Sequence, residues 1–183
     1  MITYKLGEFE VTGDKLMACD PCYIRKGSEP FYNVLIENVL PGTYTATVTV
    51  FDNDETGGFG DRNAEIAICH KDYDIEYPTD LITDGANCVG VDTAQALFID
   101  KKHYDEFINK SEEEKDKFYW ACCDITTKNN VNAGIISDIP VSSTGYGDGC
   151  YNVYVERDDD NKKVVAASIV FIYEDEVEVK TDE

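Results

Sequence analysis

Two segments of the chain alternate apolar and polar residues in the same way. Residues 42–48 (Gly-Thr-Tyr-Thr-Ala-Thr-Val) place a tyrosine and small aliphatic side chains on one parity, and residues 149–155 repeat this pattern. Period-two alternation is typical of a β-strand that buries one face. Return strands are predicted around residues 64–68 and 165–169, and the polar loop before each of them predicts a hairpin.

A second pair of matching segments lies upstream of these strands. Residues 11–20 and residues 91–100 each run from a valine through an apolar stretch to an aspartate. Together the two matches predict a duplicated strand unit. One copy covers about residues 9–72, and the other covers about residues 88–171.

The second copy contains an insertion at about residues 101–123. Its apolar side chains recur at helical spacing, which predicts short helices near residues 101–109 and 112–123. Ser111 and Glu114 form a capping-box pattern at the start of the second helix.

These elements predict a single α+β domain, dominated by β structure, over residues 1–183. Mostly antiparallel sheets from the two diverged repeats are expected to share one core, followed by an acidic tail at residues 174–183. The 183 residues are 43% hydrophobic and 11% aromatic, which is enough for such a core. No segment has the roughly 18 apolar residues of a membrane helix, and the first residues lack the features of a signal peptide, so a cytoplasmic location is expected.

The seven cysteines are an odd number in a chain expected to stay in a reducing compartment. We therefore expect no disulfide and no bound metal, with most thiols buried as small apolar groups. Residues 19–22 (Cys-Asp-Pro-Cys) form a CxxC motif that permits a redox role, or a zinc site with cysteines from elsewhere in the chain. The motif ends a predicted strand and does not open a helix, which favours simple core packing.

Net charge is the most unusual property of the composition. The chain has 37 acidic and 16 basic residues, a net charge of −21, and the two halves carry −10 and −11. Repulsion disfavours direct binding to nucleic acid or to anionic membranes, whereas a basic protein partner is favoured. The alternative is that the charge only keeps the protein soluble.

Two polar loops contain further candidates. Residues 52–57 (Asp-Asn-Asp-Glu-Thr-Gly) resemble the first half of a calcium loop, but the glutamate expected at its twelfth position is Asn63. A hairpin turn explains the same residues without an ion. The glycine-rich segment 145–149 precedes a strand, so it lacks the helix N-terminus of a phosphate loop. Phe59 and Tyr146 are expected to be exposed aromatic contacts on these loops.

Asp20 and Asp100 occupy matching positions at the ends of the two apolar strands. A symmetric pair of carboxylates is able to bind a cation or a ligand, or to act as acid and base. The alternative, which we favour, is that each aspartate caps the following turn or helix by accepting backbone N–H bonds.

The sequence contains no assembled catalytic motif. His70 and His103 are its two histidines, and neither lies in a known nucleophile context. His70 falls on the inward parity of its strand and is expected in the core. We predict a non-enzymatic protein with no catalytic residues and no cofactor.

Several of these motifs resemble a known bacterial and phage family. The apolar strand that ends in Asp-Pro (residues 15–21), the Pro-Gly-x-Tyr strand (41–44) and the Gly-Asp-Gly-x-Tyr-x-Val-Tyr segment (147–154) are similar to domain of unknown function 4241. The resemblance spans about residues 9–171. It implies a fold and a bacterial or phage setting, and it implies no chemistry.

Charge and fold together predict an acidic inhibitor that occupies the basic nucleic-acid-binding groove of a protein, such as an anti-CRISPR-like or nuclease-inhibiting protein. A small-ligand or cation-binding β domain is the alternative. The residues predicted to bind the partner are Asp52, Asp54, Tyr146, Glu112, Glu113, Asp158 and Asp159.

Overall fold

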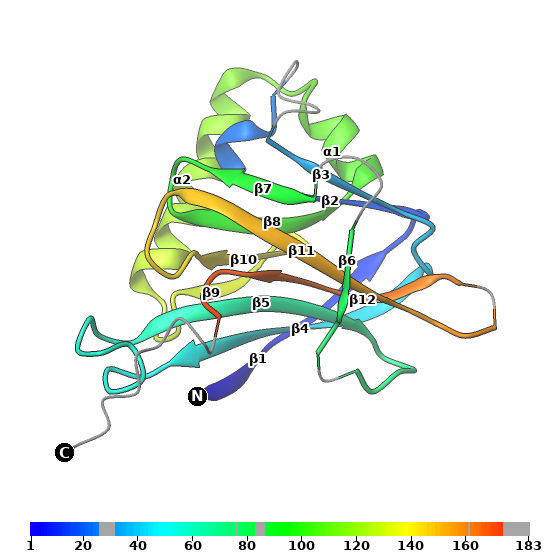
Figure 1. Ribbon diagram of the computed structural model, residues 1–183. Helices are drawn as coiled ribbons and strands as arrows, with labels where there is room; N and C mark the ends of the chain where they lie inside the picture. The colour runs from blue at the N-terminus through cyan, green and yellow to red at the C-terminus, as the bar shows by residue number, and fades with distance from the viewer. Residues whose placement is uncertain (26–31, 76, 83–86, 161, 174–183) are drawn as a thin grey trace.

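The computed structural model describes residues 1–25, 32–75, 77–82, 87–160 and 162–173. Within these residues the chain forms two antiparallel sheets and two α-helices (Figure 1). The predicted α+β class, dominated by β structure, is confirmed. The predicted acidic tail at 174–183 lies outside the described residues.

Seven strands of the described chain form the larger sheet. They are β1 (Ile2–Val11), β4 (Gly42–Phe51), β5 (Arg62–His70), β6 (Asp80–Leu81), β7 (Cys88–Val91), β11 (Gly149–Arg157) and β12 (Val164–Val170). Their order is β1-β4-β5-β12-β11-β6, and β7 pairs with the first half of β11. Hairpins therefore build most of this sheet.

The smaller sheet has five strands in the described chain. They are β2 (Lys15–Cys19), β3 (Val34–Glu37), β8 (Gln95–Asp100), β9 (Ala133–Ile136) and β10 (Ile139–Ser143), in the order β3-β2-β8-β10-β9. Every residue of β8 is buried, because the strand is covered on both faces. This double burial explains why its sequence is a continuous apolar run without alternation.

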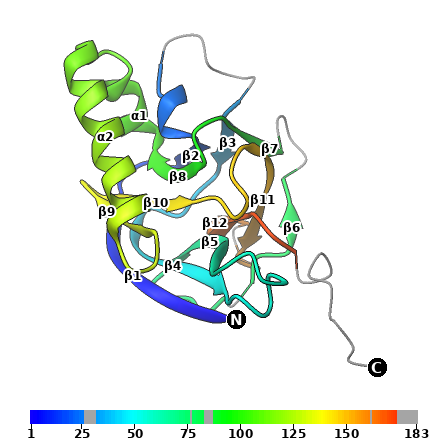
Figure 2. The same ribbon diagram turned by 90° about the vertical axis from the view of Figure 1, so that its left-hand side faces the viewer.

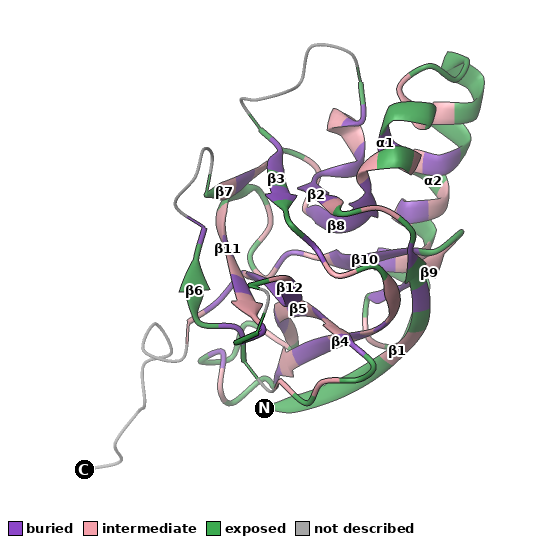
Figure 3. Cartoon of the chain, turned by 90° about the vertical axis from the view of Figure 1, so that its right-hand side faces the viewer, coloured by how far each residue is buried: buried purple, intermediate pink, exposed green. Residues whose placement is uncertain are grey.

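The inserted helices are α1 (Lys101–Phe107) and α2 (Glu112–Lys128). They pack on the face of the smaller sheet that points away from the larger sheet (Figures 2 and 3). Ser111 and Glu114 form the predicted capping box at the start of α2. The helix continues five residues beyond the predicted end at residue 123.

Two apolar clusters fill this three-layer arrangement. The main core lies between the sheets and takes Leu16 and Ala18 from β2. The second core lies under the helices and takes Met17 and Cys19 from the same strand. The two repeats therefore share the main core, and the insertion adds a second one.

The strand registers of the two halves follow the same pattern, as the predicted duplication requires. In each copy a strand ending in valine lies opposite a strand beginning with glycine: Val11 opposite Gly42 and Phe9 opposite Tyr44, then Val91 opposite Gly149 and Val89 opposite Tyr151. The hairpins repeat the match, with Ala46 opposite Ile68 and Val153 opposite Ile169. An approximate two-fold axis therefore passes between β2 and β8 in the smaller sheet and between β5 and β12 in the larger sheet.

The expectation that the chain contains no disulfide is wrong. Cys88 on β7 and Cys150 on β11 are bonded, with their Cα atoms 5.6 Å apart. Adjacent strands bring the two thiols within bonding range, and an odd cysteine count excludes only complete pairing. The remaining free cysteines are Cys19, Cys22, Cys69, Cys122 and Cys123.

Candidate functional site

Asp20 and Asp100 form reciprocal contacts between the two copies. Asp20 directly follows β2 in the first copy, and its Oδ2 accepts hydrogen bonds from the backbone N–H groups of Asp92 and Thr93 in the second, both at 2.9 Å. Asp100 ends β8, and its Oδ2 accepts hydrogen bonds from the N–H groups of Thr12 (2.7 Å) and Gly13 (3.1 Å) in the first copy. Each aspartate thus holds the turn of the other repeat.

The same carboxylates also cap the element that follows each strand. Asp20 Oδ1 accepts a bond from Cys22 N–H at the start of the 3₁₀ helix η1 (Pro21–Tyr23), and Asp100 Oδ1 accepts one from Lys102 N–H at the start of α1. Burial alone would raise the pKa of Asp100, but the N–H and hydroxyl donors outweigh it and lower that pKa below its ordinary value. These hydrogen bonds are the ones expected if each aspartate caps the turn or helix that follows it. Among the described residues, no group of three or more His, Cys, Asp or Glu side chains is arranged to hold a metal ion.

The CxxC motif has the surroundings of packed thiols. Cys19 is fully buried in the second core. Burial, followed by the neighbouring Asp20 carboxylate, raises the pKa of Cys22 far above its ordinary value. A reactive cysteine requires a stabilised thiolate, so this environment disfavours redox chemistry at Cys22.

His70 is buried, as its parity predicts. Its ring contacts Tyr44 edge-on at 5.2 Å between centroids, and its Nε2 lies close to Gly42. The side chain therefore packs in the hairpin.

The loop at residues 52–61 is held by its own side chains. Asp52 Oδ1 accepts hydrogen bonds from the N–H groups of Asp54 and Glu55, at 2.9 and 3.0 Å. Thr56 is buried and donates its hydroxyl to the carbonyl of Gly60 at 2.8 Å. These bonds account for the Asp and Thr residues of the calcium-like pattern without an ion.

The glycine-rich loops of the two copies meet at one end of the molecule. Phe59 from the first loop contacts Tyr146 from the second, with ring centroids 6.1 Å apart. Phe59 is 68% exposed and Tyr146 is 56% exposed. Asp61 and Tyr146 line the same small cavity, which also supports their proximity. We call this region the loop surface, comprising Asp52, Asp54, Phe59, Asp61, Tyr146 and Asp148.

The other predicted partner-binding carboxylates lie elsewhere. Glu112 and Glu113 are exposed at the start of α2, at the opposite end of the molecule from the 52–61 loop (Figures 1 and 2). Asp159 is exposed in the β11–β12 turn. Asp52 and Asp54 therefore share the 52–61 loop with Phe59, whose ring contacts Tyr146, and the remaining carboxylates lie elsewhere.

Asp158 was expected to be exposed, and this is wrong. The residue is 8% exposed. Its carboxylate accepts hydrogen bonds from the Tyr73 hydroxyl and from Lys163 N–H, each at 3.1 Å. Asp158 therefore ties the turn of its own hairpin to residue 73, like the structural aspartates described above.

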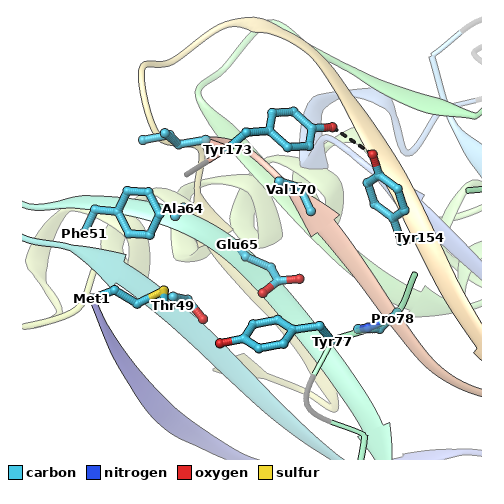
Figure 4. A pocket seen from close by; sticks show the side chains of 11 residues that line it. Met1, Thr49, Phe51, Ala64, Glu65, Tyr77, Pro78, Tyr154, Val170 and Tyr173 are labelled. Carbon is cyan, nitrogen blue, oxygen red and sulfur yellow. Dashed lines mark hydrogen bonds between the residues drawn. The ribbon is translucent and has the colours of Figure 1, made fainter. Parts of the chain in front are cut away.

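The sequence analysis missed a cavity of about 300 Å³ on the outer face of the larger sheet. Its lining includes Glu65, Phe51, Tyr77, Tyr154 and Tyr173 (Figure 4). Burial raises the pKa of Glu65 above its ordinary value, and the nearby Ser168 hydroxyl opposes this only in part. We call this the Glu65 cavity. The alternation in β5 places Glu65 on the outer face of the sheet. The tyrosines that cover it come from distant segments of the chain, so the local pattern does not indicate a cavity.

The described residues define a duplicated two-sheet α+β domain with an outer helical layer. The chain belongs to the family described as "Protein of unknown function (DUF4241)", whose model matches residues 9–168. The resemblance inferred from the motifs is thus confirmed. No curated protein and no solved structure matches the chain. None of the helices in the described residues is long and apolar enough to cross a membrane.

Proposed function

We propose that this protein is a non-enzymatic inhibitor that binds a basic protein and occupies the groove in which that protein holds nucleic acid. The loop surface is the observation that carries this proposal. Two exposed aromatic rings lie there beside carboxylates from both repeats. Aromatic anchors account for much of the binding energy in protein interfaces, and charged groups around them select a complementary partner.

The distribution of charge supports two separate roles for the carboxylates. Asp52, Asp54 and Asp61 lie on the loop surface, where they would contact lysines and arginines directly. Glu112, Glu113 and Asp159 lie away from it and would act at longer range by attracting a basic partner. A net charge of −21 makes such attraction strong at low salt.

The biological setting is part of the same proposal. We place the protein in the bacterial cytoplasm, encoded by a phage or mobile element, with a host nucleic-acid enzyme or defence nuclease as its partner. An anti-CRISPR-like role is of this kind. Direct binding to nucleic acid or to a membrane is not expected, because a strongly acidic surface repels both.

Two triple variants with the same charge change test the proposal. One is D52K/D54K/D61K on the loop surface, and the other is E112K/E113K/D159K away from it. A partner would be isolated with the wild-type chain, purified, and used in binding kinetics from low to high salt. The loop-surface variant should dissociate faster, whereas the remote variant should change mainly the association rate and its salt dependence.

Two further measurements decide between mimicry and other forms of recognition. The partner's own nucleic acid should compete with this protein for binding, and Tyr146→Ala should weaken binding by about tenfold or more, as loss of an anchor does. Affinity that hardly changes with salt, together with complete loss of binding in Tyr146→Ala, means recognition by shape and rejects mimicry. Simultaneous binding of nucleic acid and inhibitor also rejects it.

A further inference from the structure

The Glu65 cavity combines one carboxylate with several aromatic rings. Ile66 of β5 points into the main core, so the neighbouring Glu65 lies on the outer face of the larger sheet. Figure 4 shows its carboxylate among the rings of Phe51, Tyr77 and Tyr154. Among the described residues that line the cavity there is no lysine, arginine or histidine, and the N-terminal ammonium of Met1, which also lines it, is paired with Glu55. The carboxylate is therefore surrounded by aromatic and aliphatic groups.

We propose that the Glu65 cavity binds an alkylammonium group. The faces of aromatic rings are negative and attract cations, and aromatic cages bind organic ammonium groups in this way. A carboxylate within the cage adds a charged hydrogen-bond acceptor for an N–H donor. The alkyl part of the ligand would contact Val170 and Pro78, which also line the cavity. This inference concerns different residues from the loop surface and does not depend on the proposed function.

Other ligand classes suit the cavity less well. An anion would be repelled by Glu65, because the described lining has no cationic side chain and the Met1 ammonium is already paired with Glu55. A metal ion needs several oxygen or nitrogen ligands, and no such group exists among the described residues. A neutral apolar ligand would remove water from the carboxylate without supplying a hydrogen-bond donor, which is costly for a buried charge.

Hydrogen bonds between the lining residues hold the tyrosines in position. Tyr154 and Tyr173 lie with their hydroxyl oxygens 3.1 Å apart, and the Asn152 amide donates to the Tyr173 hydroxyl at 2.8 Å. Rings that are fixed before binding lose little entropy when a ligand enters. A volume of about 300 Å³ lies at the small end of ligand sites and fits a group of a few heavy atoms.

Calorimetry with butylammonium, 1-butanol and butanoate tests the proposed charge selectivity. The amine should bind, and the alcohol and the acid should bind at least about tenfold more weakly, because hydrogen bonds to charged groups contribute this much. Glu65→Gln should weaken amine binding by about tenfold or more for the same reason. Asp116→Asn, which removes an exposed carboxylate on α2 outside both proposed sites, is the control and should leave binding unchanged.

Substitutions at Tyr77 test the aromatic part of the cage. Tyr77 is half-exposed, so its replacement leaves the cores intact. Tyr77→Leu should weaken butylammonium binding by about 2- to 30-fold, and Tyr77→Phe, which keeps the ring, should not. Amide NMR shifts at Ala64 and Val170 would place the ligand in the cavity. They would also show that the variants remain folded.

The possible results separate clearly. Equal binding of butylammonium and 1-butanol would show a merely apolar hollow and overturn the proposal, as would unchanged amine binding in Glu65→Gln. A peptide that contains lysine tests whether the bound ammonium group belongs to a protein and not to a free amine. Tighter binding of that peptide than of butylammonium assigns the ammonium group to a partner protein, and weaker binding assigns it to a free amine. Failure of either charge-reversal variant to change binding of the protein partner would not affect these outcomes.

Discussion

Removing the Asp100 carboxylate tests the contacts that join the two repeats. Its Oδ2 accepts bonds from Thr12 N–H (2.7 Å), Thr12 hydroxyl (2.8 Å) and Gly13 N–H (3.1 Å), and Oδ1 accepts one from Lys102 N–H (2.9 Å). In Asp100→Asn one oxygen becomes an NH₂ group that faces a donor, and the other oxygen loses its charge. Each hydrogen bond to a charged group contributes about 1.5–3 kcal/mol. Because these contributions are not additive, we expect a loss of about 3–5 kcal/mol in the free energy of unfolding.

The effect should depend on pH with a definite sign. Hydrogen bonds hold the pKa of folded Asp100 below its ordinary value of 3.8, despite the opposing effect of burial. A lowered pKa means that the stabilisation is fully present above the unfolded-state pKa and is lost as pH falls through the folded-state pKa. The difference between wild type and Asp100→Asn should therefore be full at neutral pH and shrink in strong acid.

Urea unfolding followed by circular dichroism measures both effects. Asp116→Asn on the exposed face of α2 is the control and should change stability by less than about 0.5 kcal/mol. Asp20→Asn, at the equivalent position of the first repeat, should behave like Asp100→Asn. An Asp100→Asn midpoint equal to that of the Asp116 control would refute the idea that this carboxylate joins the repeats.

Three further changes have expected outcomes. Cys88→Ser removes the disulfide and should lower stability by about 2–4 kcal/mol, a loss that a reductant reproduces in the wild type during thermal melting. Glu65→Gln should raise the unfolding free energy at neutral pH, because burial raises the pKa of that carboxyl, and the gain should vanish below the unfolded-state pKa. Gly42 has a φ of +148°, and in Gly42→Ala the added Cβ would lie 2.3 Å from His70 Nε2. The substitution should lower the free energy of unfolding by about 1–3 kcal/mol, as measured by thermal melting. Gly58→Ala, at a φ of +93° but with open space, should cost less.

The duplication was predictable because it depends on local patterns. Alternation over residues 42–48 and 149–155 fixes which face is buried, and the register repeats this match between Tyr44 and Tyr151. The capping box at Ser111 was predictable for the same reason, since it involves residues three apart. Strands β3 and β9 are only four residues long, and segments this short carry too little periodicity to be identified.

The disulfide and the Glu65 cavity depend on contacts between distant segments. Cys88 and Cys150 are 62 residues apart, and neither thiol lies in a motif that indicates pairing. Glu65 has the outward parity of an ordinary surface residue. Tyr154 lies near it because β12 pairs with both β5 and β11, and Tyr77 lies just before β6, which pairs with β11. The exposure of Phe59 and Tyr146 was anticipated, but their mutual contact required the folded arrangement of the two repeats.

The candidate sites lie where the two repeats differ. A shift of 101 residues relates β5 to β12, as the hairpin registers require, so the position equivalent to Glu65 is Ala166. A shift of 107 residues relates β4 to β11, so Thr47 stands where the second copy has Tyr154. The equivalent positions in the other half thus lack the carboxylate of Glu65 and the ring of Tyr154. The shared positions Asp20 and Asp100 connect the two repeats, and the diverged positions form the cavity that we propose as an amine-binding site.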